Sequence, residues 1–432
     1  MQEQRRERIA IIGSGISGLA TAHALDPQHD ITVLEADSRV GGHSNTVVVE
    51  EGGRSLGIDT GFIVYNQRNY PLFSRLLESL GVKTQASEMS FSYSSDITGL
   101  EYSGTSLNTL LARRSNILRP SFVRMLADVP RFGRDASRLL ASGDISTSLA
   151  DFLADGGYSR PFIDDYLVPL GASIWSADPV RFAEFPAAPL ARFLERHGLL
   201  SLQDRPEWRT VSGGSREYVK ALVAPFADRV RTSHPVRKVW RDRDSVLVFS
   251  PASPEPERFD RVVFATHADT TLAILADPSP AETSVLGAFH FQRNRATLHT
   301  DSSLLPARRR AWASWNYRQV GAGQRLPVIS YYANRLQRLE SKAAYITTLN
   351  ADTDIDSSKM LASFDYTHPV FDSNAMKAQL RHGEIDGVRN THFCGAYWGY
   401  GFHEDGVQSA VTVCRRIELA GRRAPRAGLV TV

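Results

Sequence analysis

Residues 8–36 of the chain read RIAIIGSGISGLATAHALDPQHDITVLEA, and this stretch decides the fold. Its first five residues are mostly isoleucine and predict a buried strand, and a second apolar strand is expected at Ile31 to Leu34. A helix is expected between the two strands, and Glu35 directly follows the second one. This order predicts a βαβ unit that binds a dinucleotide, with the Glu35 carboxylate accepting hydrogen bonds from ribose hydroxyls. A carboxylate at this position disfavours a 2′-phosphate and therefore NADP.

Three glycines between the first strand and the helix have the spacing G-x-G-x-x-G, at Gly13, Gly15 and Gly18. Gly13 permits a tight turn, Gly15 lets a pyrophosphate approach the backbone, and Gly18 lets the helix pack closely on the strand. The backbone amides of Ile16 and Ser17 are then expected to point at the phosphates, with the positive end of the helix dipole behind them. The glycines therefore predict a phosphate-binding turn.

The chain continues from Glu35 as EADSRVGGHSNT, and the pattern E-x-x-x-R-x-G-G resembles a known FAD-binding signature. The signature belongs to the amine oxidase, protoporphyrinogen oxidase and phytoene desaturase superfamily. The resemblance implies that Glu35 holds the ribose and that Arg39 lies along the adenosine-pyrophosphate side of FAD. It also implies that Gly41 and Gly42 pass close to the pyrophosphate and the flavin. The remaining expected FAD contacts in this stretch are Ala36, His43 and Ser44. His43 departs from the family pattern, which usually has Arg or Lys there.

Three later segments also resemble parts of this FAD-binding domain. Residues 211–222, VSGGSREYVKAL, resemble a turn and helix found midway along these proteins. The segment from Val236 to Val239 resembles the strand whose backbone touches the adenine. Residues 260–269, DRVVFATHAD, resemble the strand that ends the second block of the domain.

Near the end of the chain, residues 392–411 read HFCGAYWGYGFHEDGVQSAV. In this superfamily the last strand and helix return to the first βαβ unit and close over the flavin, and the stretch fits that return. A strand is expected at residues 392–394, a turn at Gly395, and the last helix is expected to open at Gly406. The amides of Gly406 and Val407 would then face the ribityl chain or the pyrimidine edge, where negative charge develops on reduction.

The same stretch carries the candidate catalytic residues, His403, Glu404 and Asp405. His403 is the first candidate for a base because imidazole titrates near neutral pH, and Glu404 is the second. The alternative is that the three residues cap the helix opening at Gly406. Six side chains are expected to line the substrate pocket: Tyr65, Asn66, Tyr397, Trp398, Tyr400 and Phe402. For the four residues between 397 and 402, packing in the core is the competing interpretation.

The chain is predicted to be an α/β protein with a Rossmann-like, discontinuous FAD-binding domain of the amine oxidase type and an α+β substrate domain. The FAD-binding domain is expected to comprise residues 1–65, 206–275 and 386–432. The substrate domain is expected to comprise residues 66–205, which show helical periodicity, and residues 276–385, which contain β-rich runs.

Composition excludes several classes of function. A formal net charge of +3 on 432 residues is too small to indicate nucleic-acid binding. Cys394 and Cys414 lack metal-ligand spacing, so no metal site is expected, and both are interpreted as buried thiols in a reducing cytoplasm. The N-terminus lacks the apolar core of a signal peptide, and no apolar run reaches the ~18 residues of a membrane span. A cytoplasmic protein, or one peripheral to the inner face of the membrane, is expected.

Several phrases, among them DTGFIVYNQRNYP, AWASWNY and CGAYWGYGFHEDG, are similar to a narrower branch. It comprises bacterial predicted FAD-binding, amine-oxidase-like proteins and the N-terminal flavoprotein domain of plant cyclopropane fatty acid synthases. The resemblance implies oxidation or desaturation of an unsaturated, methyl-branched or cyclopropane-type fatty acyl chain by hydride transfer to the flavin. The alternatives are an amine oxidase, an isoprenoid or polyene desaturase, and a non-catalytic flavoprotein partner of a lipid methyltransferase.

Residues 113–134 read RRSNILRPSFVRMLADVPRFGR, with arginines interleaved among apolar residues. A basic amphipathic segment of this kind can dock on an anionic membrane surface. A helix with one core face and one solvated basic face is the alternative.

Overall fold

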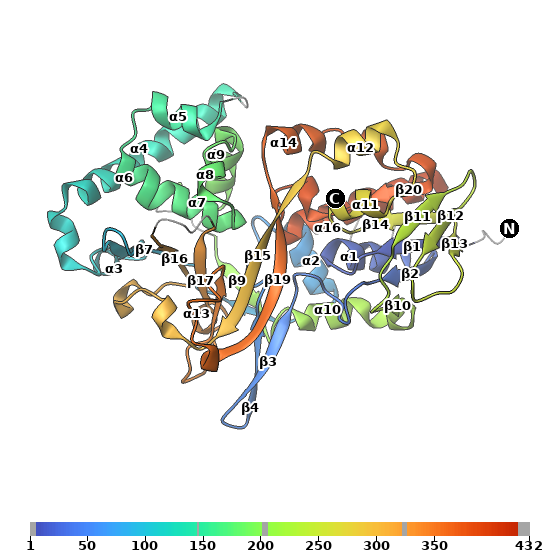
Figure 1. Ribbon diagram of the computed structural model, residues 1–432, viewed down its shortest axis with the longest axis horizontal. Helices are drawn as coiled ribbons and strands as arrows, with labels where there is room; N and C mark the ends of the chain where they lie inside the picture. The colour runs from blue at the N-terminus through green and yellow to red at the C-terminus, as the bar shows by residue number, and fades with distance from the viewer. Residues whose placement is uncertain (1–5, 145–146, 201–205, 322–325, 422–432) are drawn as a thin grey trace.

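The computed structural model describes residues 6–144, 147–200, 206–321 and 326–421. One end of the molecule is built on a five-stranded parallel sheet, on the right in Figure 1, with the strand order β10-β2-β1-β14-β20. Its strands are β1 (Arg8–Ile12), β2 (Asp30–Leu34), β10 (Val230–Arg231), β14 (Arg261–Phe264) and β20 (Thr391–Phe393). The predicted α/β fold with a Rossmann-like sheet is confirmed.

The first βαβ unit has the predicted form. Helix α1 (Ile16–Leu25) follows the glycine turn and is buried along its whole length. It packs against the last helix, α16 (His403–Gly421). A Cβ atom on Gly18 would lie 2.0 Å from the carbonyl oxygen of Gly13, so only glycine lets the helix approach the turn this closely.

A seven-stranded sheet forms the centre of the molecule, and the two long strands β19 and β15 form one edge of it (Figure 1). The order is β19-β15-β18-β17-β16-β7-β8, antiparallel except between β16 and β7. The strands are β7 (Phe91–Ser95), β8 (Glu101–Ser103), β15 (His290–His299), β16 (Trp315–Gln319), β17 (Val328–Tyr332), β18 (Ile346–Leu349) and β19 (Met360–Val370).

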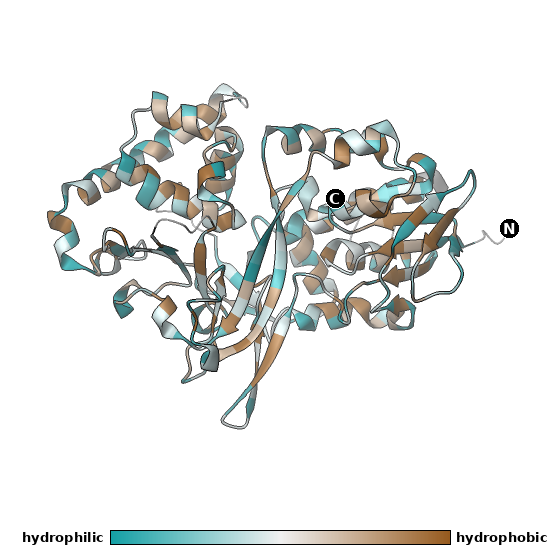
Figure 2. Ribbon diagram, viewed as in Figure 1, coloured by the Kyte–Doolittle hydropathy of each residue, from teal (hydrophilic) through white to brown (hydrophobic). Residues whose placement is uncertain are grey.

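A block of helices packs against this sheet at the end remote from the parallel sheet (Figure 1). It contains α3 (Leu107–Leu110), α4 (Pro120–Ser142), α5 (Leu149–Asp155), α6 (Arg160–Phe162), α7 (Val168–Trp175), α8 (Pro179–Phe182) and α9 (Ala187–Arg196). Its amphipathic helices turn their apolar sides inward, so brown and teal residues alternate along them in Figure 2.

Shorter elements complete the fold. The small strands are β3 (Thr46–Glu51), β4 (Arg54–Asp59), β5 (Tyr65–Asn66), β6 (Thr84–Ala86), β9 (Trp208–Val211), β11 (Lys238–Arg241), β12 (Val246–Phe249) and β13 (Glu257–Phe259). The remaining helices are α2 (Pro71–Ser79), α10 (Arg216–Val223), α11 (Ala268–Ile274), α12 (Pro280–Leu286), α13 (Ala333–Leu336), α14 (Ser373–Gln379) and α15 (His382–Ile385). None of the described helices is long and apolar enough to cross a membrane.

Two predicted boundaries are wrong. The last helix begins at His403, not at Gly406, because Phe402 and Asp405 already form its first hydrogen-bonded turn. The strand expected at Val236 to Val239 is β11, which begins at Lys238 and pairs antiparallel with β12. The predicted domain boundaries remain predictions, although the five-stranded and seven-stranded sheets each draw their strands from segments assigned to one domain.

A buried ion cluster joins β11 to the loop before α12 and to α12 itself. The Arg241 side chain is fully buried and donates to the carboxylate of Glu282, with an Nη2–Oε2 distance of 2.9 Å. Its Nε also donates to the Asp277 carboxylate at 3.1 Å, and its Nη2 to the Asp277 carbonyl oxygen at 2.7 Å. Removing the guanidinium would leave the buried Glu282 carboxylate without its counter-ion.

Arg241→Ala is therefore expected to lower the free energy of unfolding by about 3–5 kcal/mol. Urea denaturation followed by circular dichroism measures this change. Arg243→Ala, two residues along on an exposed loop, is the control and is expected to change stability by less than about 0.5 kcal/mol. Equal stability of the two variants would contradict the assigned role.

Candidate active site

A cavity of about 1490 Å³ lies between the parallel sheet and the block of helices. It begins at the turn between β1 and α1, passes under β15 and β19, and ends along α4. Single small-molecule sites usually occupy roughly 300–1,000 Å³. The cavity therefore has room for a dinucleotide and a substrate together.

The inner end of the cavity is shaped for a pyrophosphate. Gly13 has φ +103°, and a Cβ atom there would lie 2.8 Å from the carbonyl oxygen of Ala265. Gly15 instead faces open space, because no atom lies within 4 Å of the place of an added Cβ. No side chain caps the start of α1 at Gly15, so its first amides face the cavity, as an anion requires.

Glu35 and Arg39 line the same end of the cavity. The Glu35 carboxylate accepts hydrogen bonds from the backbone N–H of Ser14 and of Asp37, both at 2.9 Å, which fix its orientation. Arg39 donates through Nη2 to the carbonyl oxygen of Gly42 at 2.8 Å. Its Nη1 is buried and has no hydrogen-bond partner among the described residues. A buried guanidinium donor without a partner fits the bound pyrophosphate of FAD.

The structure brings most of the predicted cofactor residues to the cavity wall. Those that line it are Gly13, Gly15, Ile16, Ser17, Glu35, Arg39, Gly41, Gly42, His43 and Gly395. The predicted residues outside the lining are Gly18, Ala36, Ser44, Val236, Gly406 and Val407. Of these, Gly406 sits where a Cβ would meet Ile16 and Ser17 at 2.7 and 2.9 Å. It thus holds α16 against the start of α1.

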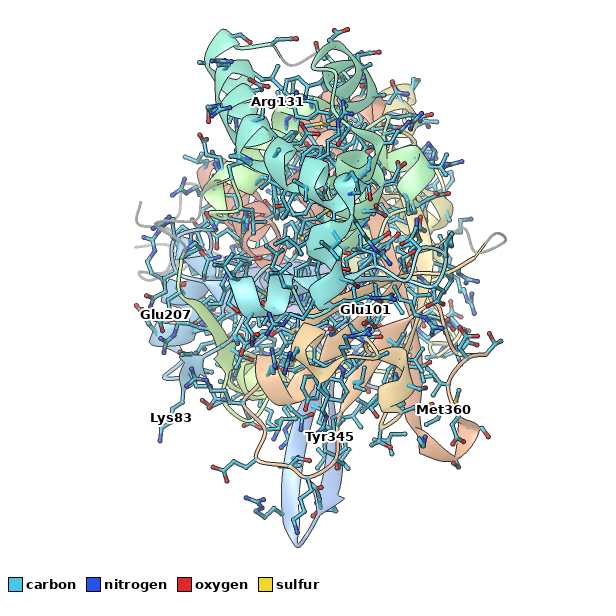
Figure 3. All side chains as sticks on the ribbon, turned by 90° about the vertical axis from the view of Figure 1, so that its left-hand side faces the viewer. Lys83, Glu101, Arg131, Glu207, Tyr345 and Met360 are labelled. Atoms are coloured by element: carbon cyan, nitrogen blue, oxygen red, sulfur yellow. The ribbon has the colours of Figure 1, made fainter. Side chains whose placement is uncertain are left out.

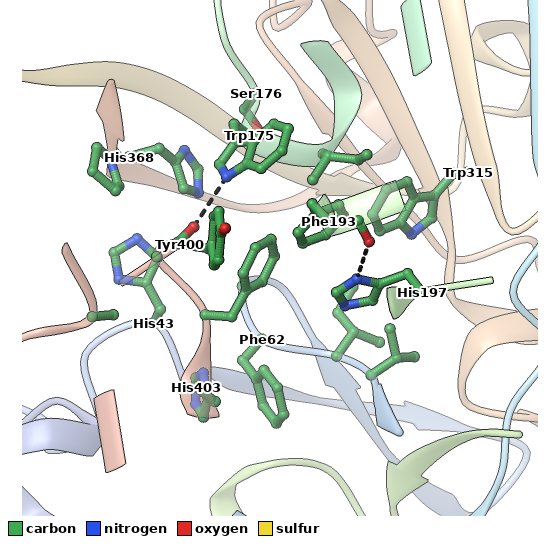
Figure 4. A pocket seen from close by; sticks show the side chains of 18 of the residues that line it. His43, Phe62, Trp175, Ser176, Phe193, His197, Trp315, His368, Tyr400 and His403 are labelled. Atoms are coloured by element: carbon green, nitrogen blue, oxygen red, sulfur yellow. Dashed lines mark hydrogen bonds between the residues drawn. The ribbon is translucent and has the colours of Figure 1, made fainter. Parts of the chain in front are cut away.

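A cluster of histidines, which no pattern in the sequence connects, forms one wall of the cavity (Figure 4). The ring of His43 lies 6.2 Å from that of His267 and 5.4 Å from that of His368, and it stacks on Tyr366 at 4.9 Å. Burial lowers the pKa of His43 well below its usual value. The pKa of His368 is lowered to about 4, mainly by burial and further by the neighbouring His267. The cluster is therefore uncharged at neutral pH. His43 Nε2 is buried without a partner among the described residues and is available to a bound group.

His403 lies in the cavity wall, stacked on Phe62 with ring centroids 3.6 Å apart (Figure 4). Its Nε2 lies 3.0 Å from Ser44 Oγ and 3.0 Å from the hydroxyl of Tyr218. Burial lowers its pKa to about 3, far from the range near neutral pH in which a general base works best. This geometry favours a role in positioning the site over the predicted role of base.

The neighbouring acids point away from the cavity. The Glu404 carboxylate accepts hydrogen bonds from the backbone N–H of Leu72 at 3.0 Å and of Phe73 at 2.9 Å, so it caps α2. Asp405 accepts from the backbone N–H of Phe402 at 2.9 Å and caps α16. The expected cap at Gly406 is thus corrected to two caps on two helices. Glu404 lies outside the cavity lining, where a catalytic role has no substrate to act on.

The predicted pocket aromatics divide into two groups. Tyr400 and Phe402 line the cavity, and the carbonyl oxygen of Tyr400 accepts a 3.0 Å hydrogen bond from Trp175 Nε1 (Figure 4). Tyr397 touches the cavity but packs against Phe289 at 4.9 Å. The others are outside the lining: Trp398 packs on Phe289, and Tyr65 and Asn66 are buried beneath it. The interpretation of Trp398 as a core residue therefore holds. The prediction that Tyr65 and Asn66 line the pocket is wrong, because both residues lie in the short buried strand β5.

The outer half of the cavity is mostly apolar and is built by the block of helices. Its apolar lining includes Met125, Leu126, Val129, Leu170, Ile174, Trp175, Phe193, Leu199 and Leu200. Two arginines of α4, Arg134 and Arg138, join this lining and are exposed to solvent. Outside the dinucleotide end, Asp365 is the one acid among the described lining residues, and it pairs with Arg295 at 2.9 Å. Sequence periodicity identified α4 as amphipathic but did not show that its apolar face borders a cavity.

Comparison with known proteins agrees with this architecture. The family model described as flavin containing amine oxidoreductase matches residues 16–334. An L-amino-acid oxidase of Mus musculus is 24% identical over 269 residues, which are 58% of this chain and 40% of that protein. The chain thus spans less than half the length of this curated relative.

Two solved structures share the fold across nearly the whole chain. The cyclohexylamine oxidase from Brevibacterium oxydans has a TM-score of 0.67 at 18% identity and covers 96% of this chain and 100% of its own. A fatty acid isomerase from P. acnes has a TM-score of 0.66 at 18% identity, with 95% and 98% covered. At these identities the likeness establishes the fold.

Gly15→Val is expected to leave the protein folded but without flavin. The φ of −68° and ψ of −179° at Gly15 suit valine, and the added side chain would enter open space that the pyrophosphate needs. The flavin absorbance per mole of purified protein measures retention, and circular dichroism measures folding. Gly18→Ala is the contrasting variant, expected to lower thermal stability even without flavin. If the Gly15→Val protein keeps its flavin, the turn between β1 and α1 does not bind the pyrophosphate as assigned.

Proposed function

Because the chain belongs to the flavin containing amine oxidoreductase family and FAD is its cofactor, we propose that it is an FAD-dependent oxidoreductase of fatty acyl chains. The proposed reaction is oxidation or desaturation of an unsaturated, methyl-branched or cyclopropane-type chain. The observation that carries this proposal is the apolar outer half of the cavity, which ends at arginines. The superfamily resemblance in the sequence is confirmed by the family match.

The charges around the cavity favour a carboxylate over an ammonium group. Arg134 makes no hydrogen bond or ion pair with a described residue, and Arg138 pairs with Asp135 at 3.0 Å. The acid of the outer lining, Asp365, is 63% exposed and already paired with Arg295. An amine that is protonated at neutral pH would find no unpaired carboxylate among the described residues of this outer lining. An acyl chain can place its methylenes on the apolar wall and its carboxylate near Arg134.

Each part of the cavity wall has a definable task in this reaction. FAD, when bound, accepts the hydride that the substrate loses. The apolar residues of α4 and α7, such as Leu126 and Leu170, exclude water and hold the chain along the cavity. Tyr400 and Phe402 add aromatic rings to the cavity wall. His43 Nε2, buried and uncharged, is placed to form a hydrogen bond with a bound group at the dinucleotide end.

Amine oxidation is the second candidate, and the aromatic wall favours it. Trp175, Tyr400 and Phe402 present rings to the cavity, and such rings can hold an amine or a cation. Relatives named as oxidases of amino acids and of cyclohexylamine share this fold. An isoprenoid desaturase and a non-catalytic partner of a lipid methyltransferase also fit an apolar cavity. Neither explains the arginines at its outer end.

Anaerobic reduction of the bound flavin separates these candidates. We expect the flavin absorbance band to bleach on addition of unsaturated, methyl-branched or cyclopropane fatty acids or their esters, and not on addition of primary amines. A carotenoid precursor and an aliphatic amine panel complete the set. Bleaching by amines alone would move the protein to the second candidate, and bleaching by none would indicate a non-catalytic role.

Arg134→Gln tests whether the carboxylate of the acyl substrate binds near Arg134. Removal of one exposed charge is expected to raise the KM for a free fatty acid about two- to fivefold, with kcat unchanged, and to leave the KM of its methyl ester the same. Arg131→Gln, one turn earlier on α4 and outside the cavity lining, is the matched control. An equal effect on acid and ester would show that Arg134 acts through packing and not through charge.

A further inference from the structure

Four large apolar side chains are exposed on α3, on the 3-10 turn after it and on α4, elements at the end of the molecule that faces the viewer in Figure 3. Leu107 of α3 is 79% exposed, Ile117 and Leu118 in the 3-10 turn Arg114–Leu118 are 58% and 81% exposed, and Val123 of α4 is 50% exposed. Single exposed apolar residues are ordinary, but four within seventeen residues of chain indicate a contact surface.

The same segment is strongly basic. Residues 107–134 contain six arginines and one aspartate, so the formal charge is 6 − 1 = +5, against +3 for the whole chain. Three of the arginines donate to neutral oxygens and not to carboxylates. Arg113 donates to the carbonyl of Gly99 at 2.7 Å, Arg114 to the Asn108 side chain at 2.8 Å, and Arg119 to the carbonyl of Thr98 at 3.1 Å. Their positive charge is held in place by neighbours that do not cancel it.

We define the basic apolar surface as the four exposed apolar residues together with four arginines. Its members are Leu107, Ile117, Leu118, Val123, Arg113, Arg114, Arg119 and Arg124.

The basic apolar surface is continuous with the apolar wall of the cavity. On α4, Val123 lies one turn before Leu126, which lines the cavity and is followed on the same face by Val129 and Pro130. On α3, Leu107 lies one turn before Leu110, which also lines the cavity. On each of these two helices, an exposed apolar side chain is thus followed one turn later by one that lines the cavity.

We propose that the basic apolar surface docks on an anionic lipid bilayer, so that the outer end of the cavity opens beside the membrane. Leucine, isoleucine and valine would enter the interface while the arginines pair with lipid phosphates and acidic headgroups. A second copy of this chain is a poorer partner, because a symmetric contact would bring together two surfaces that carry four arginines each. Nucleic acid is also a poorer partner, because its phosphates would pair with the arginines but leave the exposed leucines without an apolar contact.

Vesicle co-sedimentation of the flavin-loaded protein tests the docking. Wild-type protein is expected to sediment with vesicles containing phosphatidylglycerol and to stay in the supernatant with pure phosphatidylcholine. One variant removes the apolar contribution, Ile117→Asp with Leu118→Asp. A second removes the charge, Arg113→Glu, Arg114→Glu and Arg119→Glu. Each is expected to weaken the apparent affinity for anionic vesicles more than tenfold.

Controls carry substitutions of the same kinds elsewhere on the chain. Leu380→Asp changes a leucine that is 86% exposed beyond the end of α14, and the triple variant Arg237→Glu, Arg243→Glu, Arg258→Glu changes exposed arginines on and beside the small β11–β13 sheet. Both controls are expected to bind like wild type, and retained flavin absorbance shows that each variant is folded.

Three outcomes would overturn the docking. The wild type could fail to bind anionic vesicles, or the controls could lose binding equally. The third outcome is that the substitutions in the basic apolar surface leave vesicle binding unchanged and alter only the molecular mass measured by light scattering. The last outcome would assign the surface to contact between two copies. Vesicle binding does not require turnover. The docking can therefore fail while the proposed reaction stands, and the proposed reaction can fail while the docking stands.

Discussion

The contact between the starts of two helices from opposite ends of the chain determines where the cavity can form. At Gly18, the backbone of α1 comes so close to the β1–α1 turn that a Cβ would lie 2.0 Å from a carbonyl oxygen. At Gly406, α16 approaches Ile16 and Ser17 almost as closely. Glycine at both points lets the phosphate-binding turn and the return from β20 share one wall. His403 and Phe402, just before Gly406, are thereby brought to the same cavity as Gly15.

Burial then sets the chemistry of that wall. The imidazoles of His43, His368 and His403 are held in a region that disfavours charge, and their pKa values fall accordingly. Neutral imidazoles can donate and accept hydrogen bonds without a counter-ion, which suits a redox site that must also accept an apolar chain. The positive charge needed near the pyrophosphate comes instead from Arg39 and the start of α1.

The fold could be predicted from local sequence because the glycine turn, the short strand β1 and the acid after β2 lie within thirty residues. The cofactor end of the cavity follows from the same stretch. The rest could not be predicted, because it depends on contacts between distant segments. Glu404 caps α2, more than three hundred residues earlier. His267, after β14, and His368, in β19, reach His43 from distant parts of the chain. No spacing rule distinguishes Tyr400, which lines the cavity, from Trp398, which packs in the core.

An apolar cavity and an exposed apolar surface are solutions to one physical constraint. Moving each methylene of an acyl chain into water costs about 0.8 kcal/mol, so a chain of ten methylenes faces about 8 kcal/mol if it must cross solvent. A soluble amine faces no such barrier and needs no apolar path. On α3 and α4 the residues that line the cavity from Leu110 to Gly133 carry no charge, and the first charged lining residue is Arg134. An uncharged lining of this kind suits a substrate that water rejects, such as the acyl chain proposed above.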